Sequence, residues 1–236
     1  MQIITMFAPL SSKCRPGRKR TDFVGVTIHN TGNGSKGAGA KSHGKYLQGG
    51  GKNTAASWHY AVDENCSVQS IPEEEVAWHA GDGQGRGNLQ TIAIEICMNS
   101  DGNLLKATDN AAELAADILR RNNIVNAAGW LWQHNNWSGK NCPQMIRAGK
   151  PYNWKEFVNR VQAHLDKREE PELTQEKFNE MMENYLKMKG EEPSASWAQD
   201  KWDKATAAGI FDGSRPQGPF TRQEAAVVLD RLRLVK

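Results

Sequence analysis

The chain has 236 residues, enough for one ordinary domain and a small second one. Its 30 basic residues nearly balance its 27 acidic ones, so it lacks the concentrated basic stripe of a phosphate-tracking protein, and we expect no nucleic-acid partner. No stretch approaches the roughly 20 apolar residues that span a membrane, and the N-terminus MQIITMFAPL does not read as a signal peptide. The four cysteines have no paired spacing, which excludes a zinc ribbon and a thioredoxin motif and fits a protein made in a reducing cytosol.

The first features along the chain are a basic cluster and an alternating segment. RPGRKR at residues 15–20 is interpreted as a solvated surface loop, with attraction to an anionic wall polymer as the alternative. Residues 23–28 alternate in polarity and predict a strand. One face of that strand carries Val24, Val26 and Ile28, and the other carries Thr27 and His29.

A glycine-rich run and two further strands follow. The run at 32–51 does not match the phosphate-loop pattern GxxxxGK[ST], so we interpret it as a mobile loop. Residues 57–63 and 67–71 predict two strands, joined by a turn at Glu64 and Asn65.

Residues 91–97, TIAIEIC, repeat the alternation, with isoleucines on one face and Glu95 on the other. Apolar residues at helical spacing over 111–121 predict a helix that covers the isoleucine face. Asn153 is the expected N-cap of the last helix of this domain. The opposite face of the sheet, with His29 and Glu95, is then left for chemistry. Glu95 could instead be an edge residue in water, but a carboxylate is costly to bury without a partner.

The remainder of the chain predicts a small helical domain. A charged, proline-containing segment around 164–174 is typical of a linker. A domain of roughly 60 residues buries little core, so we expect this one to pack on itself, on the first domain or on a second copy. Its expected helices carry an apolar stripe (Phe178, Met181, Met182, Tyr185, Leu186), a tryptophan-containing segment (Trp197, Trp202, Ala205) and a capping box of Thr221 with Glu224.

Two histidines and a cysteine form a candidate zinc site. His29 lies at the end of the first strand, and His134 and Cys142 lie in QHNNWSGKNCP. Two imidazoles and one thiolate leave a coordination position for water, which is typical of a hydrolytic rather than a structural zinc site. Two ordinary histidines and a buried thiol are the alternative. Lys140 could face an oxygen at the metal, or it could be a solvated lysine.

Five motifs in order, IHNTG, SWHYAVD, VAWHAGDG, IAIEIC and QHNNWSGKNCP, resemble the type-2 N-acetylmuramoyl-L-alanine amidase family over about residues 1–165. Phage amidase lysins and peptidoglycan recognition proteins share this fold. The resemblance implies an α/β domain with a mixed central sheet, helices mainly on one face and a zinc cleft on the other. It also implies that His29, His134 and Cys142 hold Zn²⁺ and that the run at 32–51 borders the substrate groove.

The resemblance assigns further roles. Glu95 resembles the strand glutamate that acts as general base, and Lys140 resembles the lysine that stabilises the oxyanion. Trp58 stands where the phage-lysozyme branch has a catalytic tyrosine, so that tyrosine role is not carried over. We expect Trp58 to contact substrate, and His79 to be either a hydrogen-bonded loop histidine or a substrate contact.

The tail has a resemblance of its own. Residues 194–234 resemble a single S-layer-homology unit, a module that usually occurs in several copies and holds anionic wall polymer. One copy makes polymer binding by a monomer doubtful and self-association plausible, and Arg222 is the wall contact to test first. The expected domains are residues 1–165 (zinc amidase), 166–173 (linker) and 174–236 (helical, for wall binding or oligomerisation).

The expected activity is hydrolysis of the amide between N-acetylmuramic acid and the L-alanine of the stem peptide. With a wall-degrading domain and no signal peptide, the chain is expected to be a phage or prophage endolysin. It would be made in the host cytoplasm and would act on the bacterial wall after release. A host autolysin and a peptidoglycan-binding module without catalysis are the alternatives.

Overall fold

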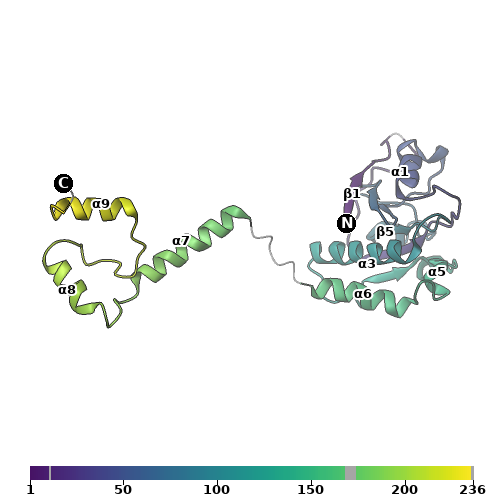
Figure 1. Cartoon of the computed structure of the whole chain (residues 1–236). Coiled ribbons are helices and arrows are strands. Elements are labelled where there is room, and N and C mark those ends of the chain that lie inside the picture. The colour runs from purple at the N-terminus through teal and green to yellow at the C-terminus, as the bar shows by residue number, and fades with distance from the viewer. Residues whose placement is uncertain (11, 168–173, 235–236) are drawn as a thin grey trace. The chain divides into compact units, whose positions relative to one another are not determined.

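A computed structural model describes residues 1–10, 12–167 and 174–234. The chain divides into two compact units, Met1–Arg168 and Glu169–Lys236, which we describe separately (Figure 1). Most of the linker expected at 166–173 lies outside the described residues. Within the described ranges, no helix is both long enough and apolar enough to span a membrane.

A six-stranded mixed sheet forms the centre of the first unit. Its strand order is β1-β4-β3-β5-β2-β6. The pairing of β3 with β4 is antiparallel, and the other neighbouring pairs are parallel. The strands are β1 (Gln2–Thr5), β2 (Gly25–Asn30), β3 (Tyr60–Val62), β4 (Cys66–Gln69), β5 (Thr91–Ile96) and β6 (Leu131–Gln133). The sequence analysis predicted the mixed sheet and its strands β2 to β5, but it missed β1 and β6.

The register of β2 and β5 brings the side chains of His29 and Glu95 together. The strands are parallel, and His29 lies opposite Glu95. Since both residues belong to the same alternating set, both side chains leave the sheet on the same face. β2 begins at Gly25, whose φ is +128° and whose missing Cβ would lie 2.1 Å from the carbonyl oxygen of Trp130. Only glycine fits this crossing of β2 and the segment before β6.

Two helices cover the isoleucine face, where the sequence analysis predicted only the first of them. Helix α3 (Leu104–Arg121) begins seven residues before the predicted start, where the Asn103 side chain accepts from the backbone N–H of Lys106. Helix α6 (Trp154–Asp166) begins after the predicted N-cap Asn153, which accepts from Glu156. Both pack into one apolar cluster with the isoleucines of β5. Burial of these side chains is the main source of stability in the unit.

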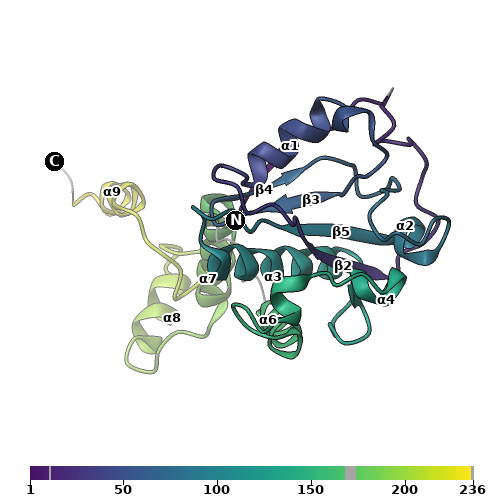
Figure 2. The ribbon, with the colours of Figure 1, turned by 90° about the vertical axis from the view of Figure 1, so that its right-hand side faces the viewer.

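The glycine-rich run at 32–51 is not simply a loop, so that prediction was wrong. It contains helix α1 (Ala40–Gln48), which is followed by the 3₁₀ turn η1 (Gly51–Asn53). Ala40 packs with Ala61 of β3 and Val68 of β4, on the face opposite α3. Figure 2 shows strands β3, β4 and β5 between α1 and α3. Gly44 allows this approach, because a Cβ there would lie 2.4 Å from the side chain of Val68.

The basic cluster at 15–20 is a surface loop, as predicted, with residues 16–19 exposed, but the arginines at its two ends are bound to the domain. The Arg15 guanidinium binds both carboxylate oxygens of Glu75, and these side chains are each 13% exposed. The Arg20 Nε donates to the backbone carbonyl of Glu73. The acidic segment after β4 therefore holds the cluster against the domain, which weakens the idea that it attracts a wall polymer.

Three short helices complete the first unit. They are α2 (Arg86–Gln90), α4 (His134–Ser138) and α5 (Gln144–Arg147).

The second unit contains α7 (Gln175–Glu191), α8 (Gln199–Ala207) and α9 (Arg222–Arg231) among its described residues. The rings of Trp202 and Phe211 stack at 5.2 Å, and Phe220 meets Phe211 edge-on at 6.0 Å. The capping box of Thr221 and Glu224 is confirmed. Of the described residues of this unit, Gly190 alone is buried, so its core is as small as its length suggested.

Candidate metal centre and substrate pocket

Three donor atoms from distant parts of the chain meet at the end of β2. The Nδ1 atoms of His29 and His134 are 3.0 Å apart, and the Sγ of Cys142 is 3.8 Å from His29 Nδ1. One ligand atom from each residue lies within 4.8 Å of the other two, and all three residues are buried. The structure therefore brings together the three residues that the sequence analysis proposed as zinc ligands.

The loop between His134 and Cys142 is folded back on itself. Helix α4 starts at His134 and ends at Ser138, and its C-cap Gly139 adopts the left-handed conformation with φ +74°. The side-chain amide of Asn135 donates to the carbonyls of Gly139 and Lys140, and its backbone N–H donates to the carbonyl of Cys142. These bonds return Cys142 to the side of the helix on which His134 lies.

Asn30 joins the same loop to the sheet. Its backbone N–H donates to Cys142 Sγ at 3.4 Å, and its side-chain oxygen accepts from the backbone N–H of Met145 at 3.0 Å. The sequence analysis did not identify Asn30 as a site residue. Its place directly after His29 in IHNTG was the available signal.

His79 lies behind His29. Its Nδ1 is 3.0 Å from His29 Nε2, and the residue is only 9% exposed. Asn88 positions this loop, because its side-chain oxygen accepts from the backbone N–H groups of His79 and Ala80. His79 thus lies in the pocket wall and bonds a candidate ligand, a contact that the sequence analysis did not foresee.

Burial sets the protonation of the three candidate ligands. It lowers the pKa of His29 well below its usual value, and the neighbouring His79 and His134 lower it further. Burial also lowers the pKa of His134. These imidazoles are therefore neutral, which is the form that binds a metal. Burial raises the pKa of the Cys142 thiol to about 11, so a metal would have to displace its proton.

Glu95 lies beside the three donors without a firm partner of its own. Its Oε1 is 3.9 Å from His29 Nδ1, while Oε2 is buried and has no hydrogen bond. Burial raises the pKa of Glu95 to about 8, and the positive charge of Lys140 lowers it in part. Such a carboxyl group is suited to accept and return a proton near neutral pH.

These side chains line one pocket of about 360 Å³ on the open face of the sheet. Trp58 forms part of its wall and stacks on Tyr46 of α1, with ring centroids 6.3 Å apart. The indole N–H of Trp58 is buried without a partner. His43 is half-buried and packs edge-on against Trp58. The pocket is lined by His29, Asn30, Thr31, Gly32, Ala56, Ser57, Trp58, Trp78, His79, Glu95, His134, Lys140, Asn141, Cys142 and Gln144.

His59 has a different place from the histidines of the pocket. Its Nδ1 accepts from the backbone N–H of Ala93, and its Nε2 bonds the carbonyl of Glu75. Both ring nitrogens are used in joining β3 to its surroundings, so the role of His59 is structural.

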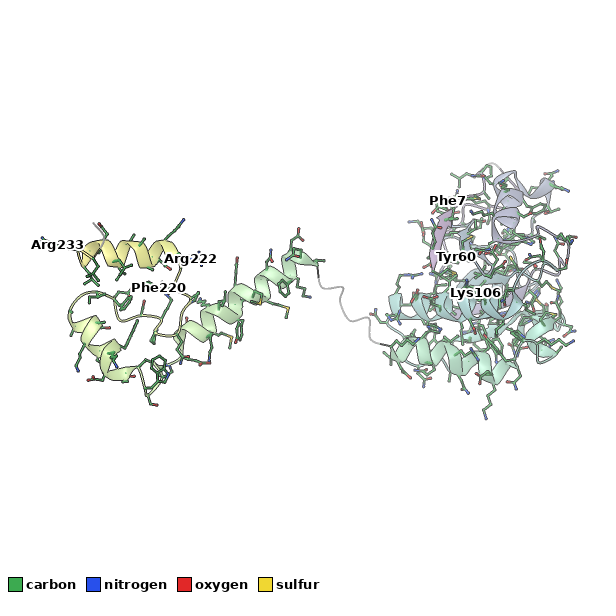
Figure 3. The ribbon with its side chains drawn as sticks, in the orientation of Figure 1. Phe7, Tyr60, Lys106, Phe220, Arg222 and Arg233 are labelled. Atoms are coloured by element: carbon green, nitrogen blue, oxygen red, sulfur yellow. The ribbon has the colours of Figure 1, made fainter. Side chains whose placement is uncertain are left out.

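The second unit has a pocket of about 630 Å³ between α8, α9 and the segment 208–221 that joins them. It is lined in part by Trp202, Phe211 and Arg215. Arg222 is exposed at the first position of α9, close in sequence to Phe220 (Figure 3). Arg222 does not line this pocket, whereas Arg215 does. Arg215 is therefore a second candidate for an anionic contact, which the sequence analysis did not single out.

The donor set of the first unit fits a zinc ion. Nitrogen and sulfur donors are the ligands that zinc prefers, and three of them leave a position open. The hydrogen bond from the backbone of Asn30 to Cys142 Sγ would support a thiolate there.

Comparison with known proteins points to one family. The sequence profile of the N-acetylmuramoyl-L-alanine amidase family matches residues 19–145. The amidase CwlH of Bacillus subtilis (strain 168) is 40% identical over 158 residues, which cover 66% of this chain and 60% of CwlH. The amidase XlyA of the same organism is 42% identical over 146 residues, 62% of this chain and 48% of XlyA. The chain thus spans about half the length of these curated relatives.

Solved structures agree with the sequence comparison. The catalytic domain of XlyA aligns with a TM-score of 0.62 and 39% identity, covering 68% of this chain and 99% of that one. The structure of PlyL aligns with a TM-score of 0.58 and 31% identity, covering 69% of this chain and 98% of that one.

Proposed function

Because the chain belongs to the N-acetylmuramoyl-L-alanine amidase family, we propose that it hydrolyses the amide between N-acetylmuramic acid and the L-alanine of the peptidoglycan stem peptide. One observation carries this proposal. Two neutral imidazoles and a thiol converge within 4.8 Å on a pocket that also holds a carboxyl group of raised pKa and a lysine. That combination suits the hydrolysis of an amide.

His29, His134 and Cys142 are the residues that would hold Zn²⁺. When bound there, zinc supplies Lewis acidity, which polarises a carbonyl and makes water more acidic. His79 supports this site by accepting a hydrogen bond from His29 Nε2, which leaves Nδ1 free of a proton.

Glu95 is the proposed proton acceptor and donor. Its carboxyl group lines the pocket and burial raises its pKa to about 8, so it is suited to receive a proton from the attacking water and deliver it to the leaving amine. Lys140 carries a positive charge at the pocket and is proposed to stabilise the negative charge that develops on the carbonyl oxygen.

Trp58 is the proposed substrate contact at the pocket wall. Its ring is held by Tyr46 and lines the pocket, where it offers an aromatic surface to the substrate. The proposed role of His79 changes from substrate contact to support of His29, because its Nδ1 is occupied by that residue.

The role of the whole protein rests on the same family. Solved relatives include a structure described as a mutant endolysin from Bacillus subtilis. We infer that this chain also lyses bacteria, as a phage or prophage endolysin that is made in the host cytoplasm and reaches the wall after release. Wall attachment through the second unit, with Arg222 as its contact to an anionic polymer, is part of this proposal.

The experiment is digestion of purified peptidoglycan with and without a chelator, followed by mass spectrometry of the products. We expect free stem peptides with a new L-alanine amino terminus, and loss of that product with the chelator. Products from a different bond, or binding to peptidoglycan without any cleavage, would contradict the proposal. A bound metal other than zinc would correct the ion alone.

A further inference from the structure

Helix α7 is exposed along almost its whole length. Each residue from Gln175 to Met188 is exposed, and the side chains project into solvent along the helix (Figure 3). Packing is confined to its C-terminal end, where the buried Gly190 lies beside Gly218, and a helix of 17 residues with so little tertiary contact is only marginally stable in water. The N-cap Thr174 stabilises the helix by only about 1 kcal/mol. We therefore expect further stabilisation of this helix from packing against a partner.

The apolar residues of α7 follow the spacing of a helix-pairing surface. Phe178, Met181, Tyr185 and Met188 are separated by three, four and three residues, which is the a/d pattern of a heptad. We name these four residues the heptad stripe. Their exposed fractions are 44%, 56%, 58% and 71%. The stripe is thus presented to solvent and has the geometry that another helix would match.

We propose that α7 is a self-association surface, which binds the α7 helix of a second copy of this chain in antiparallel orientation. The two copies would be related by a two-fold axis, so the same surface is used on both sides. In such a pair, Phe178 faces the second copy's Met188, and Met181 faces the second copy's Tyr185. Met182, which is 40% exposed, lies next to the stripe and would contact the second copy's Met182 near the two-fold axis.

The charges flanking the stripe favour the antiparallel orientation. Lys177 and Glu191 occupy equivalent flanking positions two heptads apart. An antiparallel pair places each Lys177 beside the second copy's Glu191 and so forms two ion pairs. A parallel pair leaves them about 21 Å apart along the axis. The charge distribution along the whole helix also favours the antiparallel orientation, because its two halves have opposite net charge. Residues 175–183 hold three glutamates and one lysine, and residues 184–191 hold two lysines and one glutamate.

The expected affinity is modest. A 17-residue helix is about 25 Å long, so the contact falls at the low end of interface sizes. We therefore expect a dimer that forms and dissociates with concentration.

The test is sedimentation equilibrium of the full chain over a range of concentrations. We expect a monomer–dimer equilibrium that Met181→Asp weakens by at least about tenfold, because it places a charge in the stripe. Glu183→Lys changes a charge on the outer face of the same helix and is the matched control, with the dimer constant unchanged. Amidase turnover of each variant confirms that the first unit is folded.

A charge exchange tests the orientation without touching the apolar residues. Lys177→Glu and Glu191→Lys alone should each weaken the dimer by about three- to tenfold, since each turns two ion pairs into two repulsions. The double variant restores opposite charges and should return to the original dimer constant. A chain that stays monomeric, for instance because α7 binds its own first unit, would overturn the proposal. A dimer insensitive to Met181→Asp, or a double variant no better than the single ones, would overturn it as well.

Discussion

The hydrogen bond between His79 and His29 makes a prediction about zinc affinity. In the folded protein, His29 is 1% exposed and its Nε2 lies 3.0 Å from His79 Nδ1. If His29 binds a metal through Nδ1, its single proton must be on Nε2, and His79 accepts it. Replacing His79 by leucine removes that acceptor and leaves a buried N–H without a partner.

The size of the effect can be worked out from this geometry. Loss of a hydrogen bond behind a metal ligand typically lowers metal affinity by about 10- to 100-fold, which is about 1.4 to 2.7 kcal/mol. The unpaired Nε2–H costs the folded protein about 1–3 kcal/mol in addition. His79→Leu should therefore bind zinc at least about tenfold more weakly and unfold at a lower temperature.

The matched control is His79→Asn, whose side-chain oxygen can occupy nearly the place of the lost Nδ1. We expect it to retain most of the zinc affinity. The assay is competition for zinc with a chromophoric chelator, together with thermal unfolding of the metal-free protein. If His79→Leu holds zinc as tightly as the unchanged protein, the hydrogen bond does not support the ligand and the reasoning is wrong.

Four further predictions concern the first unit. Glu95→Gln should retain zinc but lose at least about 100-fold in turnover, because the proton acceptor is gone. In the metal-free protein, the folded-state pKa of Glu95 is about 8 against an ordinary 4.5, so its contribution to stability is complete below pH 4.5 and is lost as the pH rises towards 8. Denaturant unfolding at several pH values should show this loss in the unchanged protein and not in Glu95→Gln; equal slopes would refute the assignment. Lys140→Ala should lower turnover by about 10²- to 10³-fold with unchanged zinc content, and normal turnover would exclude the oxyanion role. Gly25→Ala should destabilise the fold by several kcal/mol, about 3 or more, because its Cβ would lie 2.1 Å from the carbonyl oxygen of Trp130; an unchanged melting temperature would show that the strand can shift.

The sequence alone was sufficient where the signal is local. Alternation over residues 23–28 and 91–97 identified the two central strands, because side chains that are buried at every second position give an alternating polarity that is visible in adjacent residues. The N-cap Asn153 and the capping box of Thr221 with Glu224 were likewise predicted, since a cap depends on residues only three positions away. Local pattern failed at β1 and β6, which are four and three residues long; β3 and β4 are as short, but the turn at Glu64 and Asn65 between them marked them as a pair of strands. It also failed at α1, where glycines masked a helix that packing against β3 and β4 supports.

The same distinction holds for the candidate site: its residue types could be predicted from the sequence, but the contacts between them could not. Residue types and motif order named His29, His134, Cys142, Glu95 and Lys140 from the sequence, because the chemistry of zinc restricts its ligands to few side chains. The sequence had no means of showing that β2 and β5 pair with His29 opposite Glu95, or that His79 lies against His29. Those contacts join residues 66 and 50 positions apart, and strand register and loop hydrogen bonds set them only once the chain has folded.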